Sequence, residues 1–228
     1  MWVLGHRGVM GEGPPENTME AFRAAVDLGV DGIETDVRLT GDGRLVLFHD
    51  RLAANGEPVA DQSHAELEAA EGLHVPEVAE ALAAWPHLLW NLEVKAPAAM
   101  APLLEVLAGH DPARIVLSSF FHNVIHAHAG DQAWPLGLLL DYRPVSVAGL
   151  LNDWPERPPD YCVWRMEYAD GEVLAELNRR GVANLLYDVH SWADLHQAEA
   201  WGVAGVIMDQ PELPLGFHAH PADLGDLP

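Results

Sequence analysis

Short apolar segments alternate with amphipathic helical segments along most of this 228-residue chain, and this alternation constrains the fold more than any other feature. Neighbouring parallel strands need a crossover of about a dozen residues, usually a helix, so the pattern predicts a parallel sheet covered by helices. About eight such repeats favour a closed (β/α)8 barrel of the TIM type over an open sheet. The predicted strands span residues 2–4, 32–37, 45–48, 88–94, 115–118, 136–140, 161–164, 182–187 and 203–208.

Helical periodicity is clearest over residues 16–29, 64–72, 75–85, 171–181 and 191–202. The first of these segments also has a start signal. Asn17 can cap the free amides, while Glu20, three residues further on, can reach back to complete a capping box. Gly29 stands where this helix is expected to end.

One connection breaks the alternation. Only the segment RLTGDGR separates the second predicted strand from the third, which is too short for a crossover helix. A hairpin centred on Gly41 and Asp42 would place Glu34 opposite His49, and it would explain why nine strands are predicted for an eight-stranded barrel. A parallel connection without a helix is the alternative.

Composition limits the class of protein. No break in composition divides the chain, so we expect one domain over residues 1–228, with a loosely packed tail from about residue 217. The formal charge of −23 opposes binding to nucleic acid. No apolar run is long enough to cross a membrane, and the first residues lack a signal pattern, which predicts a cytoplasmic protein without stable membrane insertion. The pattern indicates no oligomeric state.

Four consecutive predicted strands finish in ionisable residues, in the segments GHRG, IETDV, LFHD and NLEVK. The carboxyl ends of the strands form the active-site face of such a barrel. The two-residue period of a strand puts Glu34 and Asp36 on one face, and Glu93 and Lys95 on one face. Apolar residues fill the positions between them, so these charges are expected to point into the barrel, where they need a partner or an ion.

Glu34, Asp36 and Glu93 form an all-oxygen set that suits a hard cation such as Ca²⁺ or Mg²⁺, although the same acids would also suit a solvated strand edge. His6 and His49 could act as general base and general acid, because imidazole titrates near neutral pH. Taken singly, each would more often be an ordinary histidine.

Two basic residues complete the set of candidates. Arg7 offers a planar fork for a phosphate oxygen, or it could pair with the acids. Lys95 is the only lysine among twelve Lys and Arg residues, which marks it as a candidate for a site that needs a compact point charge. Chance retention of this lysine is the alternative.

The segments HRG, PENT, IETDV, GDGRLVLFHD, LEVK and SSF follow one another from Gly5 to about Phe120, and GVIMDQP follows at residues 205–211. In this order they resemble the glycerophosphodiester phosphodiesterase family. The resemblance implies a (β/α)8 barrel in which one divalent cation and two histidines cleave a small-molecule phosphodiester, giving glycerol 3-phosphate and an alcohol.

The resemblance also implies roles for individual residues. His6 and His49 match the acid/base pair, Arg7 and Lys95 match the groups around the phosphate, and the metal ligands match Glu34, Asp36 and Glu93. Other relatives of this family are phospholipase D-like enzymes that act on lysophospholipids, which is an alternative function. A catalytically silent barrel that binds phosphate esters is an alternative from a different class.

The second half of the chain departs from the family pattern. Asp188 and His190 lie where family members often have the segment WTVN, and the segment around Trp164 is also unusual. We expect these residues to contact the alcohol part of the substrate and to alter the preference for it. Ordinary variation of the barrel wall is the alternative.

Overall fold

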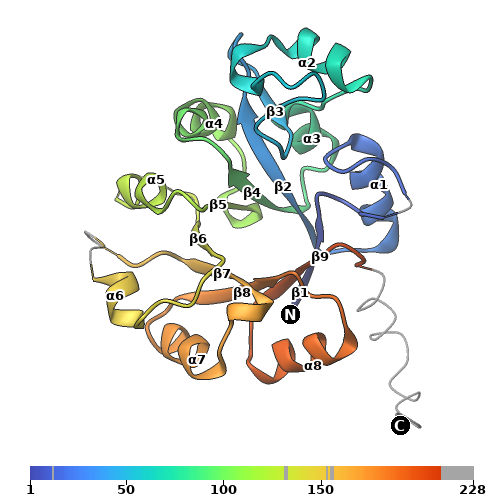
Figure 1. Cartoon of the computed structure of the whole chain (residues 1–228). Coiled ribbons are helices and arrows are strands. Elements are labelled where there is room, and N and C mark those ends of the chain that lie inside the picture. Colours follow the sequence, from blue (N-terminus) through green and yellow to red (C-terminus); the bar gives the residue numbers. More distant parts are fainter. Residues whose placement is uncertain (12, 131–132, 153, 155–156, 212–228) are drawn as a thin grey trace, which may run out of the picture.

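Eight parallel strands close into a barrel with the helices around it in the computed structural model, which describes residues 1–11, 13–130, 133–152, 154 and 157–211 (Figure 1). The barrel closes because β1 pairs with β9 on one side and with β2 on the other. The predicted (β/α)8 TIM-type barrel is therefore confirmed. The predicted loose tail from about residue 217 lies outside the described residues.

The strands are β1 Trp2–His6, β2 Gly32–Leu39, β3 Leu45–Leu47, β4 Leu89–Val94, β5 Ile115–Ser119, β6 Leu136–Leu140, β7 Tyr161–Arg165, β8 Ala183–Tyr187 and β9 Gly205–Met208. The α-helices are α1 Met19–Leu28, α2 His64–Glu71, α3 Val78–Ala84, α4 Met100–Leu107, α5 His122–Ala127, α6 Val147–Leu151, α7 Gly171–Arg179 and α8 Trp192–Ala200. Among the described residues, no helix combines the length and the apolar character that crossing a membrane requires.

The short connection between the second and third strands is a hairpin, so the parallel alternative is wrong. β3 pairs antiparallel with β2, with Val37 opposite Leu47 and Leu39 opposite Leu45. The hairpin is thus centred on Asp42, which shifts the pairing by one residue from the prediction, so the predicted pairing of Glu34 with His49 is wrong. The turn takes this form because the amide of Thr40 bonds the carbonyl of Arg44 at 2.9 Å.

β2 has different neighbours along its length. Its first half, from Gly32 to Glu34, pairs with β1, whereas its second half pairs with β3 outside the barrel. β3 is therefore a ninth strand attached to the edge of β2. The chain that leaves β3 runs directly into His49, so the hairpin carries this histidine to the carboxyl end of the barrel.

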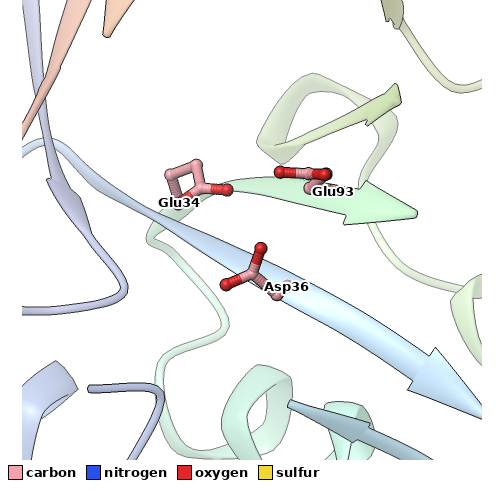
Figure 2. Close-up of side chains that lie close together, drawn as sticks. All are labelled: Glu34, Asp36 and Glu93. Carbon is pink, nitrogen blue, oxygen red and sulfur yellow. The ribbon is translucent and has the colours of Figure 1, made fainter. Parts of the chain in front are cut away.

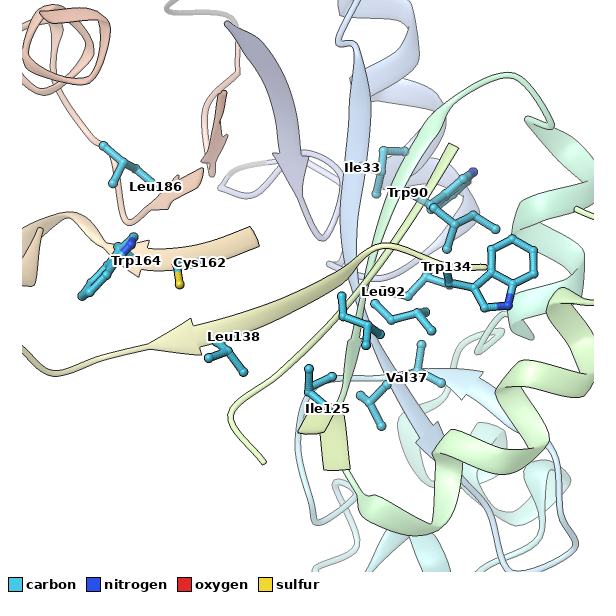
Figure 3. Packing of buried hydrophobic residues seen from close by; sticks show 14 of the residues in the cluster. Ile33, Val37, Trp90, Leu92, Ile125, Trp134, Leu138, Cys162, Trp164 and Leu186 are labelled. Carbon is cyan, nitrogen blue, oxygen red and sulfur yellow. The ribbon is translucent and has the colours of Figure 1, made fainter. Parts of the chain in front are cut away.

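Alternation along the strands divides the core into two layers. One residue set fills the interior of the barrel: Leu4, Leu89, Val116, Leu139, Val163, Leu185 and Ile207. The other set faces outward and packs against the helices, as Figure 3 shows for Ile33, Trp90, Leu138 and Trp164 among others. The barrel is thus apolar on both faces of its wall, and polar side chains are tolerated mainly at its carboxyl end.

The start of α1 differs from the prediction. Its N-cap is Thr18, whose hydroxyl accepts a hydrogen bond from the amide of Ala21 at 3.2 Å, so the proposed Asn17–Glu20 capping box is wrong. Asn17 instead has a left-handed backbone with φ of 56°, and its side chain points away to other partners. Gly29 ends the helix in a left-handed conformation, as predicted.

Phe22 anchors α1 to the barrel. Its ring is fully buried and meets Trp85 and Trp90 edge to face, with centroids 6.3 and 5.6 Å away. Replacing Phe22 with alanine should lower the free energy of unfolding by about 3–5 kcal/mol, because a large apolar side chain would leave a cavity. Urea denaturation followed by circular dichroism measures this loss.

The control is Leu28→Ala on the same helix, where the side chain is exposed and the change should stay within about 1 kcal/mol. Equal losses in the two variants would contradict the anchoring role of Phe22.

Candidate active site

Three buried carboxylates meet at the carboxyl end of two adjacent strands. Glu34 and Asp36 lie on β2 and Glu93 on β4, and the parallel register places Asp36 directly beside Glu93. Figure 2 shows the three carboxyl groups turned toward one another. One oxygen from each lies within 4.8 Å of the others, an arrangement that no other group of His, Cys, Asp and Glu reaches in the described part of the chain.

Two cationic side chains flank these acids. Lys95 Nζ lies 2.9 Å from Glu93 Oε1 and 3.3 Å from Asp36 Oδ1. Arg7 Nε lies 3.1 Å from Asp36 Oδ2, and Arg7 Nη1 donates a hydrogen bond of 2.9 Å to Glu16. Asp36 is therefore in contact with both cations, and its charge is balanced although it is almost fully buried.

The three acids do not share one protonation behaviour. Burial and the charge of Asp36 raise the pKa of Glu34 to about 8, and the same two causes raise the pKa of Glu93. Burial also opposes the charge of Asp36, but Lys95 and Arg7 outweigh it and lower the pKa of this carboxyl. Burial and repulsion between like charges therefore raise the pKa values of Glu34 and Glu93, whereas the pKa of Asp36 is lowered.

The acidic cluster fits a hard divalent cation. Its donors are all carboxylate oxygens, which Ca²⁺ and Mg²⁺ prefer. Glu34 Oε2 is buried and makes no hydrogen bond among the described residues, so this oxygen is free to coordinate an ion. A cation would also relieve the repulsion that the three acids exert on one another.

The two predicted histidines lie near this cluster in different environments. His6 Nδ1 bonds Asp209 Oδ1 at 2.5 Å, and His6 Nε2 lies 3.7 Å from Glu34 Oε2. Burial opposes the charged form of His6, but the Asp209 hydrogen bond and the Glu34 charge prevail and raise its pKa. His49 Nδ1 bonds Asp50 at 2.8 Å, while burial, together with the charges of Lys95 and Arg7, lowers its pKa.

Asn17 and Asp209 are site residues that the sequence analysis did not identify. Asn17 donates to Asp36 Oδ2 at 2.9 Å and accepts from the Thr35 hydroxyl at 2.6 Å. Asp209 holds the ring of His6. Both lie in segments that carry the family resemblance, PENT and GVIMDQP, and this was the signal that could have pointed to them.

A cavity of about 260 Å³ opens above the cluster. All the predicted site residues except Asp36, which lies beneath, contribute to its wall. The other side of the wall contains Phe120, Arg165, Tyr187 and Asp188. The structure therefore brings the seven predicted residues to one mouth of the barrel.

Only one of the three predicted contacts with the alcohol lies in this wall. Asp188 lines the cavity, and His190 is exposed beside it, bonding Asp188 through Nε2 at 2.7 Å. Trp164 is fully buried in the outer layer of the core, where its indole donates to Asn184, so the expectation that it contacts substrate is wrong. The reason is strand parity, because Trp164 alternates with the inward-facing Val163 and Arg165.

A closed (β/α)8 barrel whose mouth gathers carboxylates, histidines and cationic side chains is the architecture of a barrel enzyme. The sequence matches the model of the glycerophosphoryl diester phosphodiesterase family over residues 6–213, and the chain belongs to this family. The predicted family is confirmed, and with it the predicted class of enzyme, the phosphoric diester hydrolases.

Relatives and solved structures agree with this assignment. A glycerophosphodiester phosphodiesterase of Caldanaerobacter subterraneus subsp. tengcongensis is 29% identical, over 92% of this chain and 94% of the relative. The crystal structure of a glycerophosphodiester phosphodiesterase from Thermotoga maritima is similar with a TM-score of 0.83 and 25% identity, covering 94% of this chain and 97% of that one. A phosphodiesterase of Oleispira antarctica, solved with the product sn-glycerol-3-phosphate, shares the fold with a TM-score of 0.83 and 21% identity, covering 96% of this chain and 97% of that one.

Asn17 should matter for stability because its two hydrogen bonds fix the buried Asp36 and Thr35. Asn17→Ala should lower the free energy of unfolding by about 2–4 kcal/mol, since both partners lose a buried hydrogen bond. Chemical denaturation measures this change. Asn123→Ala, at an exposed position, should stay within about 0.5 kcal/mol; an Asn17 variant as stable as this control would contradict the prediction.

Proposed function

We propose that this protein hydrolyses glycerophosphodiesters to glycerol 3-phosphate and an alcohol, with the help of one divalent cation, Ca²⁺ or Mg²⁺. The observation that carries the proposal is the convergence of three buried carboxylates within 4.8 Å of one another, in a chain of the glycerophosphoryl diester phosphodiesterase family. The substrate is a small molecule that enters the cavity above these acids.

In this proposal Glu34, Asp36 and Glu93 hold the cation. When bound, it supplies positive charge that stabilises the charge developing on the phosphate. Arg7 and Lys95 add preorganised positive charge at the same mouth, where they bind phosphate oxygens and stabilise the transition state. They do so from side chains that the buried acids already hold in place.

His6 and His49 transfer protons in this proposal. One of them takes a proton from the attacking oxygen, which belongs to water or to a neighbouring hydroxyl of the substrate that would first give a cyclic phosphate. The other gives a proton to the leaving alkoxide. Each ring is oriented through Nδ1 by a carboxylate, Asp209 for His6 and Asp50 for His49, which leaves Nε2 of each ring for the reaction.

A phospholipase D-like activity on lysophospholipids is the second candidate function. The aromatic rings of Phe120 and Phe121 are 42% and 43% exposed just after β5, and Phe120 also lines the cavity. Such exposed apolar side chains at the mouth would suit a lipid chain.

Two further expectations belong with this proposal. The enzyme would act in the cytoplasm, and residues 1–228 would form one domain. Both stay predictions.

Incubation of the purified chain with glycerophosphocholine or glycerophosphoethanolamine and either cation should release glycerol 3-phosphate. His6→Ala and His49→Ala should each lower kcat by about 100-fold or more, because general acid–base catalysis is lost. A parallel incubation with lysophosphatidylcholine tests the second candidate, the phospholipase D-like activity. Turnover that persists in His6→Ala would contradict the mechanism, and binding without turnover would favour the silent barrel.

A thermal-shift measurement with the same protein tests the cation separately. Added Ca²⁺ or Mg²⁺ should raise the Tm of the wild type, because an ion that binds only the folded state stabilises it. Glu34→Gln should lose this rise.

The shape of the positively charged side chain at position 95 should matter as much as its charge. Lys95 reaches two acids from a side chain that is only 14% exposed, and a planar guanidinium cannot occupy the same small volume. Lys95→Arg should therefore keep the fold and lower kcat by about tenfold or more. Arg44→Lys, at an exposed ion pair, is the matched control. An unchanged kcat for Lys95→Arg would contradict a specific role for this lysine and favour chance retention.

A further inference from the structure

The cavity has a second polar group across the barrel from the proposed cation site. In the closed strand order, β7 lies opposite β2 and β8 lies opposite β4. Arg165 ends β7 and Tyr187 ends β8, and the two are register partners. Strand alternation places both above the inward-facing Val163 and Leu185, so their side chains face the cavity.

Asp188 holds the Arg165 guanidinium in one orientation. Arg165 Nε donates to Asp188 Oδ2 at 2.7 Å. The other oxygen of Asp188 bonds His190 Nε2 at 2.7 Å, so both carboxylate oxygens are engaged. The backbone of Asp188 is left-handed, with φ of 63°, a conformation that is uncommon outside glycine and is found often at functional sites.

Among the described residues, Arg165 keeps unused donors, because only its Nε is hydrogen-bonded, to Asp188. The edge that carries the two Nη groups can bind a carboxylate through two parallel hydrogen bonds. Tyr187 and Phe120 meet edge to face beside it, with centroids 6.5 Å apart, and their rings form an apolar wall.

We propose that Arg165, oriented by Asp188 in the cavity wall across from Lys95, is a specificity-determining residue that binds a carboxylate on the alcohol part of the substrate. This inference rests on the proposed function. In this inference a phosphodiester held at the cation site extends its alcohol group toward β7 and β8, where the guanidinium attracts an anionic group. One oxygen of Asp188 accepts from Arg165 Nε and the other bonds His190 Nε2, so the role of Asp188 is to orient the guanidinium.

Glycerophosphoserine and glycerophosphoethanolamine test the proposal, because they differ only in one carboxylate. The wild type should have the higher kcat/KM for glycerophosphoserine. Arg165→Gln should lower that value by about tenfold, mainly through KM, and should change the value for glycerophosphoethanolamine by less than about twofold. Asp188→Asn, which loosens the guanidinium, should shift the ratio in the same direction.

Arg143→Gln is the matched control, because this arginine is exposed and pairs with Asp170 outside the cavity wall. It should leave the ratio of the two substrates unchanged. A ratio that is the same in the wild type and in Arg165→Gln would overturn the inference while leaving the phosphodiesterase function intact.

A binding measurement distinguishes a failure of this inference from a failure of the proposed function. If the wild type cleaved neither substrate, the proposed function would fail, and calorimetry with the intact diesters would decide the role of Arg165. The His6→Ala variant should bind glycerophosphoserine more tightly than glycerophosphoethanolamine, and adding Arg165→Gln should remove this difference. Equal binding of the two diesters by His6→Ala would overturn the inference.

Discussion

The ionised carboxylate of Asp36, buried beneath the mouth of the barrel, is the group around which the site is arranged. A charge at this depth is costly unless it is paired and hydrogen-bonded. Arg7, Lys95 and Asn17 meet that requirement, and each comes from a different segment of the chain. The pairing of β2 with β4 and the turn after β1 are thereby tied to one electrostatic centre.

The ionised Asp36 carboxylate also repels the charged forms of Glu34 and Glu93. Lys95 and Arg7 favour the ionised form of Asp36, whereas Glu34 and Glu93 are pushed toward their neutral forms by burial and by Asp36 itself. Such crowding of carboxylates lowers the stability of the fold, and perturbed pKa values of this kind cluster at functional sites. Glu34 Oε2 makes no hydrogen bond among the described residues, and an added cation would relieve the most repulsion at this oxygen.

The mouth of the barrel has two sides with different chemistry. The β1, β2 and β4 side contains the acids, the histidines and the cationic side chains that suit phosphate chemistry. The β7 and β8 side contains Arg165, Tyr187 and Asp188. Both sides use residues at or just after the carboxyl ends of the strands, which is where (β/α)8 barrels carry their active sites.

The sequence by itself determined the barrel, the strand ends that would carry charge, and the faces on which Glu34, Asp36, Glu93 and Lys95 lie, because periodicity and strand alternation are local properties. It did not determine the one-residue shift of the hairpin, the outward burial of Trp164, or the bonds from Asn17 to Asp36 and from Asp209 to His6. Those depend on which distant segments meet when the barrel closes. His6 and Asp209 stand 203 residues apart along the chain, and only the pairing of β1 with β9 brings them together.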